Sequence, residues 1–274
     1  MTTNFAIIII GDEILSGKRA DKHLPKAIEL LAARGLQLAY ADYVGDDPAR
    51  ITATLKRAFQ AARESGDVVF SCGGIGATPD DHTRQCAAAA LGVKLALHPE
   101  AKALITERMQ DTAKEQGVPF DPDRADNVHR LDMGLFPVGA EIIPNPYNKI
   151  PGFTCRAGRG AVHFVPGFPV MAWPMIEGVL DGDYAHLHQT AAYIEKSIIV
   201  SGSMEATLTP LMVAIEAGHP GVKVFSLPSV DHPQYGRHIE LGVKGAPLAI
   251  DSAYPALIAG LKQFDVTFGP ELVR

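Results

Sequence analysis

The sequence predicts an α/β protein, with a three-layer α/β/α domain around a mostly parallel sheet and a smaller C-terminal α+β domain. Residues 5–10, FAIIII, form a continuously apolar and β-branched run, which is typical of a strand buried on both faces of a parallel sheet. Such runs alternate with amphipathic helical patterns, and this alternation indicates βαβ units. The pattern changes at residues 181–189, which we take as a linker between domains at residues 1–182 and 190–274.

The predicted elements have recognisable boundaries. The helix over residues 47–66 starts with Asp47 as N-cap and Pro48 at its first position, and it ends at Gly66. In the C-terminal domain the order strand, helix, strand, strand, helix (βαββα) implies a partly antiparallel sheet. The predicted strands are residues 5–10, 36–45, 67–72, 140–145, 160–167, 196–202, 222–227 and 237–243. The predicted helices are residues 26–35, 47–66, 83–92, 98–117, 169–180, 204–218 and 250–264.

Composition excludes several classes of protein. A hydrophobic content of 47% and a charged content of 20% describe a globular protein with an ample core. The net charge of −6 argues against a nucleic-acid partner, because nucleic-acid binders usually have a basic face. The first apolar run is too short for a signal peptide or a membrane span, so we expect no membrane partner. Three widely spaced cysteines favour a cytoplasmic location.

The stretch SCGGIGATPDDHT, residues 71–83, predicts a phosphate-binding turn. Gly73, Gly74 and Gly76 follow an apolar strand and precede a helix, so their N–H groups can approach a ligand with no Cβ in the way. Unsatisfied N–H groups and the helix dipole favour an anion at this position. We therefore take these glycines and Thr78 as candidate phosphate-binding residues for a small phosphorylated ligand.

Asp80 and Asp81 in the same turn have two interpretations. TPDD is a good helix opening, with Thr78 as N-cap, Pro79 at the first position and acids in the first turn. Alternatively, the two carboxylates lie beside a phosphate, which they would repel unless a cation lay between them. The second interpretation predicts a divalent metal such as Mg²⁺, with K⁺ as a further candidate ion, bound by Asp46, Asp80 and Asp81.

Two more predicted strands end in glycine and acids. The first runs into Asp12 and Glu13, and the second into Asp46, which lies one residue before the helix N-cap. Three such strand ends exceed what turns require, although Asp12 and Glu13 could equally be ordinary loop acids. The chain has no GxxxxGK[ST] motif and no GxGxxG after its first strand, so neither a P-loop nor a Rossmann fingerprint is present.

Five motifs in order resemble the MoaB/Mog molybdopterin-binding superfamily, and particularly the amino-terminal domain of CinA-type proteins. They are GDEILSG, VGDD, GGIGATPDDHT, PNPYNKIPGF and VPGFPVMAW, and the likeness covers roughly residues 4–180. The resemblance adds Asn145, Lys149 and Gly152 as candidate ligand contacts. Asn127 is a further candidate, although the polar face of a helix explains it equally well.

The resemblance also implies the chemistry of the site. Mog-type relatives adenylylate molybdopterin with two aspartates that fall on Asp46 and Asp81 here, whereas CinA-type relatives cleave the pyrophosphate of ADP-ribose with a divalent metal. We expect a metal-dependent nucleotide pyrophosphatase with these two aspartates as catalytic residues. Molybdopterin binding or adenylylation and a non-catalytic ligand-binding domain are the alternatives. The resemblance further implies a homo-oligomer, and the chain ends near the start of the CinA deamidase domain, so we do not expect that activity.

Overall fold

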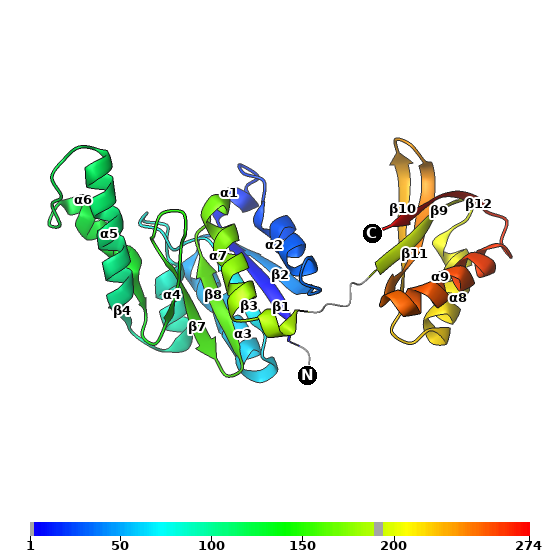
Figure 1. Cartoon of the computed structure of the whole chain (residues 1–274), viewed down its shortest axis with the longest axis horizontal. Coiled ribbons are helices and arrows are strands. Elements are labelled where there is room, and N and C mark those ends of the chain that lie inside the picture. Colours follow the sequence, from blue (N-terminus) through cyan, green and yellow to red (C-terminus); the bar gives the residue numbers. More distant parts are fainter. Residues whose placement is uncertain (1–2, 189–193) are drawn as a thin grey trace. The chain divides into compact units, whose positions relative to one another are not determined.

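The structure, a computed structural model, describes residues 3–188 and 194–274. The chain divides into two compact units, Met1–His188 and Gln189–Arg274. Figure 1 shows both units coloured along the sequence.

The amino-terminal unit contains a six-stranded sheet in the order β2-β1-β3-β8-β7-β6. The first four of these strands run parallel, and β7 and β6 add two antiparallel pairings at one edge. The prediction of a mostly parallel sheet is confirmed. The elements are β1 (Phe5–Ile10), α1 (Asp12–Leu15), α2 (His23–Ala32), β2 (Leu38–Val44), α3 (Pro48–Ser65), β3 (Val68–Cys72), α4 (Thr83–Leu91), β4 (Leu95–Leu97), α5 (Pro99–Glu115), α6 (Ala125–Leu131), η1 (Asp132–Gly134), β5 (Leu135–Pro137), β6 (Glu141–Ile143), β7 (Gly152–Ala157), β8 (Gly160–Val165), α7 (Pro169–Gly182) and η2 (Ala185–Leu187).

Burial on both faces of the sheet produces the three layers. Along β1, Ile8 and Ile10 belong to the core cluster that contains α3 and α4, whereas Ile7 and Ile9 belong to the cluster that contains α2 and α7. Successive side chains of a strand point to opposite faces, so both faces must be covered by helices. Helices α3 and α4 cover one face of the sheet and helices α2 and α7 cover the other (Figure 1).

Helix α3 shows why the predicted boundaries hold. The Asp47 Oδ1 atom accepts a hydrogen bond of 2.8 Å from the Arg50 N–H, and Pro48 occupies the first helical position. Gly66 ends the helix in the left-handed conformation, with φ 79°. Both features satisfy backbone groups that a helix end leaves unpaired. Asp46 lies between the end of strand β2 and the N-cap Asp47, so the helix start fixes the position of its backbone.

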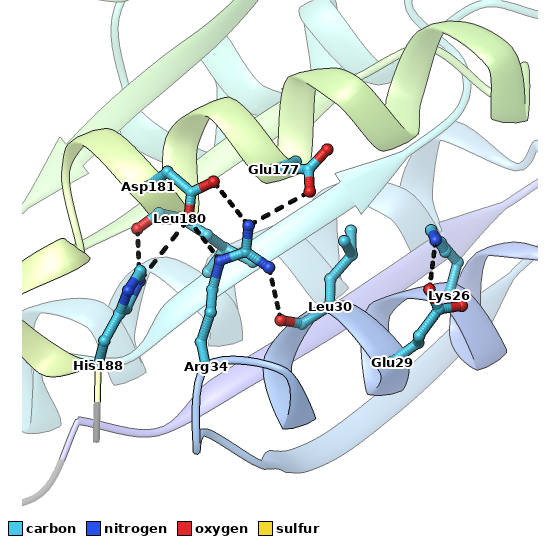
Figure 2. Close-up of polar contacts among 8 residues, drawn as sticks. All are labelled: Lys26, Glu29, Leu30, Arg34, Glu177, Leu180, Asp181 and His188. Atoms are coloured by element: carbon cyan, nitrogen blue, oxygen red, sulfur yellow. Dashed lines mark hydrogen bonds and ion pairs between the residues drawn. The ribbon is translucent and has the colours of Figure 1, made fainter. Parts of the chain in front are cut away.

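Arg34 fastens helix α2 to helix α7 on one face of the sheet, as Figure 2 shows. Its Nε and Nη2 atoms donate to the two carboxylate oxygens of Asp181 at 2.5 and 2.6 Å, and Nη1 donates to the Leu30 carbonyl at 2.8 Å. His188 donates from Nε2 to the Leu180 carbonyl at 3.0 Å. The predicted linker, residues 181–189, is therefore packed on the first unit as far as His188, and Gln189 lies outside the described residues.

The C-terminal unit is a four-stranded sheet in the order β10-β11-β9-β12 with two helices. Every strand pairing in it is antiparallel, so the expectation of a partly antiparallel sheet understated the pattern. Leu208 of α8 and Leu257 of α9 pack with Val200 and Leu241 of the sheet. The elements are β9 (Ile194–Ser201), α8 (Glu205–Gly218), β10 (Lys223–His232), β11 (Gly236–Gly245), α9 (Pro247–Leu261) and β12 (Thr267–Val273).

The sequence missed β12, because its residues TFGPELV include glycine and proline and are almost all exposed. Throughout residues 3–188 and 194–274, each helix is too short or too polar to cross a bilayer.

Candidate functional site

Four loops meet at the carboxyl edge of the parallel strands β2, β1, β3 and β8. The Gly11 N–H donates to the Val44 carbonyl at 3.0 Å, which joins the ends of β1 and β2. The Gly73 N–H donates to the Val165 carbonyl at 3.0 Å, which joins the ends of β3 and β8. Ligands of open α/β sheets bind outside this edge. The candidate site is therefore built from the loops that carry the predicted acids and glycines.

Asp12 and Asp46 lie side by side at this edge. The Asp12 N–H donates to Asp46 Oδ2 at 2.9 Å, and the Asp46 N–H donates to Asp12 Oδ1 at 3.2 Å. A Cβ atom on Gly45 would overlap Asp12 Oδ1, so glycine leaves room for the Asp12 carboxylate in this position. The structure thus brings together acids from two strand ends that are 34 residues apart.

The electrostatic environment of Asp46 is unfavourable for a carboxylate. Burial raises the pKa of Asp46, and the nearby charges of Asp12, Glu13 and Asp80 raise it further, while the hydrogen bond from the Asp12 N–H acts against them. Asp80 itself is exposed and lies in the glycine-containing turn between β3 and α4. Asp12, Asp46 and Asp80 therefore form one negatively charged group that a cation would stabilise.

The first two glycines of the turn have packing roles. Gly73 and Gly74 have φ values of +107° and +69°, in the region that favours glycine. A Cβ atom on Gly73 would overlap the Ile10 carbonyl oxygen, and one on Gly74 would overlap Thr83 Oγ1. Since its N–H donates to Val165, Gly73 cannot donate it to a ligand in this conformation, contrary to its predicted role.

The donors available to an anion come from the next residues of the turn. Within the residues that the structure describes, the N–H groups of Gly74, Ile75, Gly76 and Ala77 have no hydrogen-bond acceptor. Buried or turn N–H groups normally find a partner in the protein, in water or in a ligand. Four consecutive N–H groups form a backbone cradle of the kind that binds phosphate. We call residues 74–77 the amide cradle.

Asp81 closes the turn. Its Oδ2 atom accepts hydrogen bonds from the N–H of Thr78 at 2.8 Å and from its Oγ1 at 2.6 Å. Helix α4 begins only at Thr83, so the prediction of a helix opening with Thr78 as N-cap is wrong. The Asp81 carboxylate competes with that helix by holding residues 78–81 in a turn. Thr78 Oγ1 is already donating in this arrangement.

Asn145 organises the proline loop, residues 144–151. Its Nδ2 atom donates to Asn148 Oδ1 at 2.8 Å and to the Ile150 carbonyl at 2.9 Å, and its Oδ1 atom accepts from the Tyr147 N–H at 3.0 Å. The side chain is 4% exposed. In this conformation the predicted ligand contact is an internal brace of the loop.

Lys149 and Gly152 also have structural partners. The Lys149 Nζ atom pairs with Glu107 and Asp111 of helix α5, both at 2.6 Å. Gly152 begins strand β7, where a Cβ atom would overlap the Phe164 carbonyl oxygen. These contacts give both residues a role in packing and ion pairing, and their predicted contact with a ligand stays a prediction.

Asn127 has local partners too. The buried side chain donates from Nδ2 to the Asp121 carbonyl at 2.7 Å and accepts at Oδ1 from Arg130 Nη1 at 3.1 Å. It therefore holds the segment before helix α6.

Sequence reasoning missed a basic rim beside the acids. A cavity of about 300 Å³ at the ends of β1 and β3 is lined by Cys72 and Gly167, by Arg19, Lys22 and His23, and by the candidate acid Glu13. No ion pair within the described part of the chain engages Arg19 or Lys22. His23 donates from Nε2 to the Gly167 carbonyl at 3.0 Å, which fixes this wall of the cavity. The basic stretch GKRADKH, directly after the first acidic turn, was the available signal.

The described residues contain no group of three histidine, cysteine or acidic side chains placed to hold a metal ion. Asp81, engaged by Thr78, lies outside the pair formed by Asp12 and Asp46. The protein alone thus offers two adjacent carboxylates to a metal, with Asp80 in electrostatic range.

Comparison with known proteins identifies the class of the amino-terminal unit. Residues 6–186 match the family described as "Probable molybdopterin binding domain", and the chain belongs to this family. The crystal structure of the protein CinA with unknown function from Thermoplasma acidophilum matches 66% of this chain and 97% of that one, with 26% identity and a TM-score of 0.54.

Curated relatives of this chain include CinA-like proteins. A CinA-like protein of Anaeromyxobacter dehalogenans (strain 2CP-C) is 35% identical over 164 residues, which cover 60% of this chain and 37% of the relative. A protein of Pyrobaculum calidifontis is 28% identical over 262 residues, which cover 93% of this chain and 95% of the relative. The predicted resemblance to CinA-type members of the MoaB/Mog superfamily is confirmed. The match spans little more than a third of the CinA-like relative.

Proposed function

We propose that the amino-terminal unit binds a nucleotide pyrophosphate such as ADP-ribose at the carboxyl edge of its sheet and hydrolyses it with a divalent cation. The observation that carries the proposal is the contact between Asp12 and Asp46 beside an amide cradle with four unengaged N–H groups. Two adjacent carboxylates repel each other and would repel a phosphate. A cation between them and the phosphate removes both conflicts.

The donor set fits magnesium. Mg²⁺ keeps several waters and is usually bound by one or two carboxylates together with phosphate oxygens of the substrate. Asp12 and Asp46 supply that number of carboxylates, so an ion completed by the ligand needs no third protein group. When bound, the ion would withdraw charge from the phosphate oxygens and lower the pKa of a bound water. The sequence predicted Asp46, Asp80 and Asp81 as the metal ligands; the proposal keeps Asp46, adds Asp12 and leaves Asp80 and Asp81 outside the set.

The chain's own groups have separate tasks in this reaction. The amide cradle would orient one phosphate, and Arg19 and Lys22 would offset the charge of the other. The 300 Å³ cavity that they line would take the part of the ligand next to that phosphate. Hydrolysis adds water across one P–O bond of the pyrophosphate and releases AMP and ribose 5-phosphate. The Asp46 carboxylate would also accept the proton of the attacking water.

Molybdopterin chemistry is the second candidate, because the match to the family described as a probable molybdopterin binding domain covers residues 6–186. The same arrangement would bind a pterin phosphate, whose oxygen attacks the α-phosphorus of ATP, so that AMP is transferred to the pterin phosphate and pyrophosphate leaves. Adenylylation leaves pyrophosphate as the product, which distinguishes it from hydrolysis.

The test uses the purified full-length chain with ADP-ribose, with and without Mg²⁺ and K⁺, and measures AMP release. Metal-dependent AMP release supports the hydrolase. If no AMP forms under any of these conditions, the hydrolase is wrong, and incubation with ATP and molybdopterin tests the transferase. Metal-independent ADP-ribose binding without product, unchanged in Asp46→Asn, would instead identify a ligand-binding domain.

A further inference from the structure

A second cavity, of about 370 Å³, adjoins the glycine turn where helix α4 begins. It shares only Ala77 with the amide cradle and none of its lining with the cavity that contains Arg19 and Lys22. Its charged and titratable lining residues are Asp81, His82, Arg84, His129 and Asp132. The proposed hydrolysis gives this cavity no role.

Arg84 is the unusual member of this lining. The residue is 4% exposed, and its Nη1 atom donates to the Ile75 carbonyl at 2.7 Å. Its Nε atom is buried without an acceptor. No ion pair to Arg84 is present among residues 3–188 and 194–274. A buried charge is normally paired and hydrogen-bonded, and a guanidinium has several donors in a planar fork. Arg84 therefore lacks the partner that its burial requires.

The nearby acids do not supply that partner. Asp81 accepts both of its hydrogen bonds from Thr78 through Oδ2. The side chain of Asp132 is 57% exposed and lies 3.8 Å from His129 Nδ1. Both acids raise the pKa of Arg84, but burial lowers it by more. Their charges thus attract the guanidinium from a distance without neutralising it.

The start of helix α4 adds further donors to the same cavity. Arg84 and Gln85 belong to the first turn of this nine-residue helix, and His82 is its N-cap residue, without a side-chain cap. The Thr83 N–H already donates to the Gly74 carbonyl at 2.9 Å, so the donors that remain are those of the next residues. The first N–H groups of a helix, with its dipole, attract anions. The buried guanidinium and the helix start point to the same kind of ligand.

We propose that this cavity is a phosphate-binding site in which Arg84 contacts the oxyanion, with His82 and His129 beside it. A phosphate accepts two parallel hydrogen bonds from a guanidinium, and the fork of Arg84 contains one donor, Nε, that has no acceptor. The phosphate comes either from the free ion or from a nucleotide, and the chemistry of recognition is the same.

The experiment measures binding without metal and without turnover, so it does not depend on the proposed hydrolysis. The full-length chain is titrated with inorganic phosphate and, separately, with AMP. Binding is followed by ³¹P line broadening and by the midpoint of thermal unfolding. We expect saturable binding by the wild type, and a loss of affinity of about tenfold or more in Arg84→Met, since charge-assisted bidentate contacts are strong.

A second variant avoids the risk that Arg84→Met fails to fold. Asp132 is largely exposed, and removing its charge in Asp132→Asn leaves the cavity more positive. We expect phosphate to bind about two- to fivefold more tightly, as for removal of one partly screened like charge. Glu64→Gln is the matched control, because it removes the same charge near the last turn of α3 and does not line the cavity.

Binding by inorganic phosphate identifies the free ion as a ligand, and binding by AMP alone identifies a nucleotide phosphate; both support the site. The proposal is overturned if neither titrant binds saturably, or if Asp132→Asn binds no more tightly than Glu64→Gln. A failure of AMP release from ADP-ribose would leave these results untouched.

Discussion

We call Asp12 and Asp46, at the ends of β1 and β2, the acidic turn. Both the acidic turn and the proline loop, residues 144–151, matched motifs in the sequence, but they use their polar groups differently. In the proline loop, Asn145 meets three partners, and Lys149 meets two carboxylates. In the acidic turn, the carboxylates of Asp12 and Asp46 accept from each other's backbone N–H, and neither forms an ion pair within residues 3–188 and 194–274.

This difference distinguishes motifs that stabilise the fold from motifs that bind a ligand, although both kinds belong to the same family resemblance. Polar groups that satisfy each other stabilise a loop and have no capacity left for a ligand. Like charges held together cost stability, and a fold retains them where a ligand repays that cost. We therefore expect substitutions in the proline loop to change stability, and substitutions in the acidic turn to change ligand chemistry.

The largest expected effect is on turnover in Asp46→Asn. Losing one cation ligand and proton acceptor should lower the rate of AMP release from ADP-ribose by about a hundredfold or more. Asp47→Asn is a close control, since it removes the same charge from the next residue and asparagine is an equally good N-cap for α3. Equal rates in the two variants would show that the acidic turn is not the reaction centre.

Asn145→Ala should mainly destabilise the amino-terminal unit. It removes three hydrogen bonds of a buried side chain and leaves the Tyr147 N–H and the Ile150 carbonyl without their partner. We expect the free energy of unfolding to fall by about 2–3 kcal/mol. The single tryptophan, Trp173, lies on α7, so its fluorescence in urea reports this unit. A normal urea midpoint with a raised KM for ADP-ribose would restore Asn145 as a ligand contact and break the comparison.

Local patterns predicted what depends on neighbouring residues. The strand β1 and the helix α3, with its caps at Asp47 and Gly66, follow from short-range rules, and the structure confirms them. The helix opening at Thr78 failed, because one side-chain hydrogen bond from Asp81 decides between a turn and a helix. Strand β12 was missed, because pairing with β9 stabilises a segment whose own pattern is weak.

Partners distant in the sequence decided the rest. The acids that hold Lys149 precede it by 42 and 38 residues, and the acid that pairs with Arg34 follows it by 147 residues. No periodicity reveals such pairs. The candidate site was easier to predict, because the carboxyl ends of parallel strands meet at one edge. The sequence placed Asp46 in the site but left Asp12 open between a site acid and an ordinary loop acid. The unpaired Arg84 has no signal in the sequence, since its burial depends on the whole turn.

The ion pair between Arg34 and Asp181, which joins α2 to α7, provides a third case, in which opposite charges meet (Figure 2). Arg34 lowers the pKa of Asp181. A carboxyl whose pKa is lower in the folded than in the unfolded protein stabilises the fold above its unfolded pKa and ceases to do so as the pH falls through the folded value. Asp181→Asn should therefore cost about 1 kcal/mol at pH 7, the upper range for exposed pairs with good geometry. The difference from wild type should shrink below about pH 4. A constant difference across this range would assign the effect to packing.

The smallest expected effect has the opposite sign. Burial and the neighbouring acids raise the pKa of Asp46, so ionisation of this group disfavours the folded state once the pH rises above the unfolded value of about 4. Without metal or ligand, Asp46→Asn should be more stable than wild type at pH 7 by roughly 0.5 kcal/mol, as for partly exposed charges. This gain should vanish below about pH 4, where wild-type Asp46 is protonated in both states. Urea unfolding followed by Trp173 fluorescence measures it beside Asp181→Asn, which loses the same charge. If both variants lose stability at pH 7, then Asp46 is stabilised within the fold as Asp181 is, and a cation is no longer needed to explain the acidic turn.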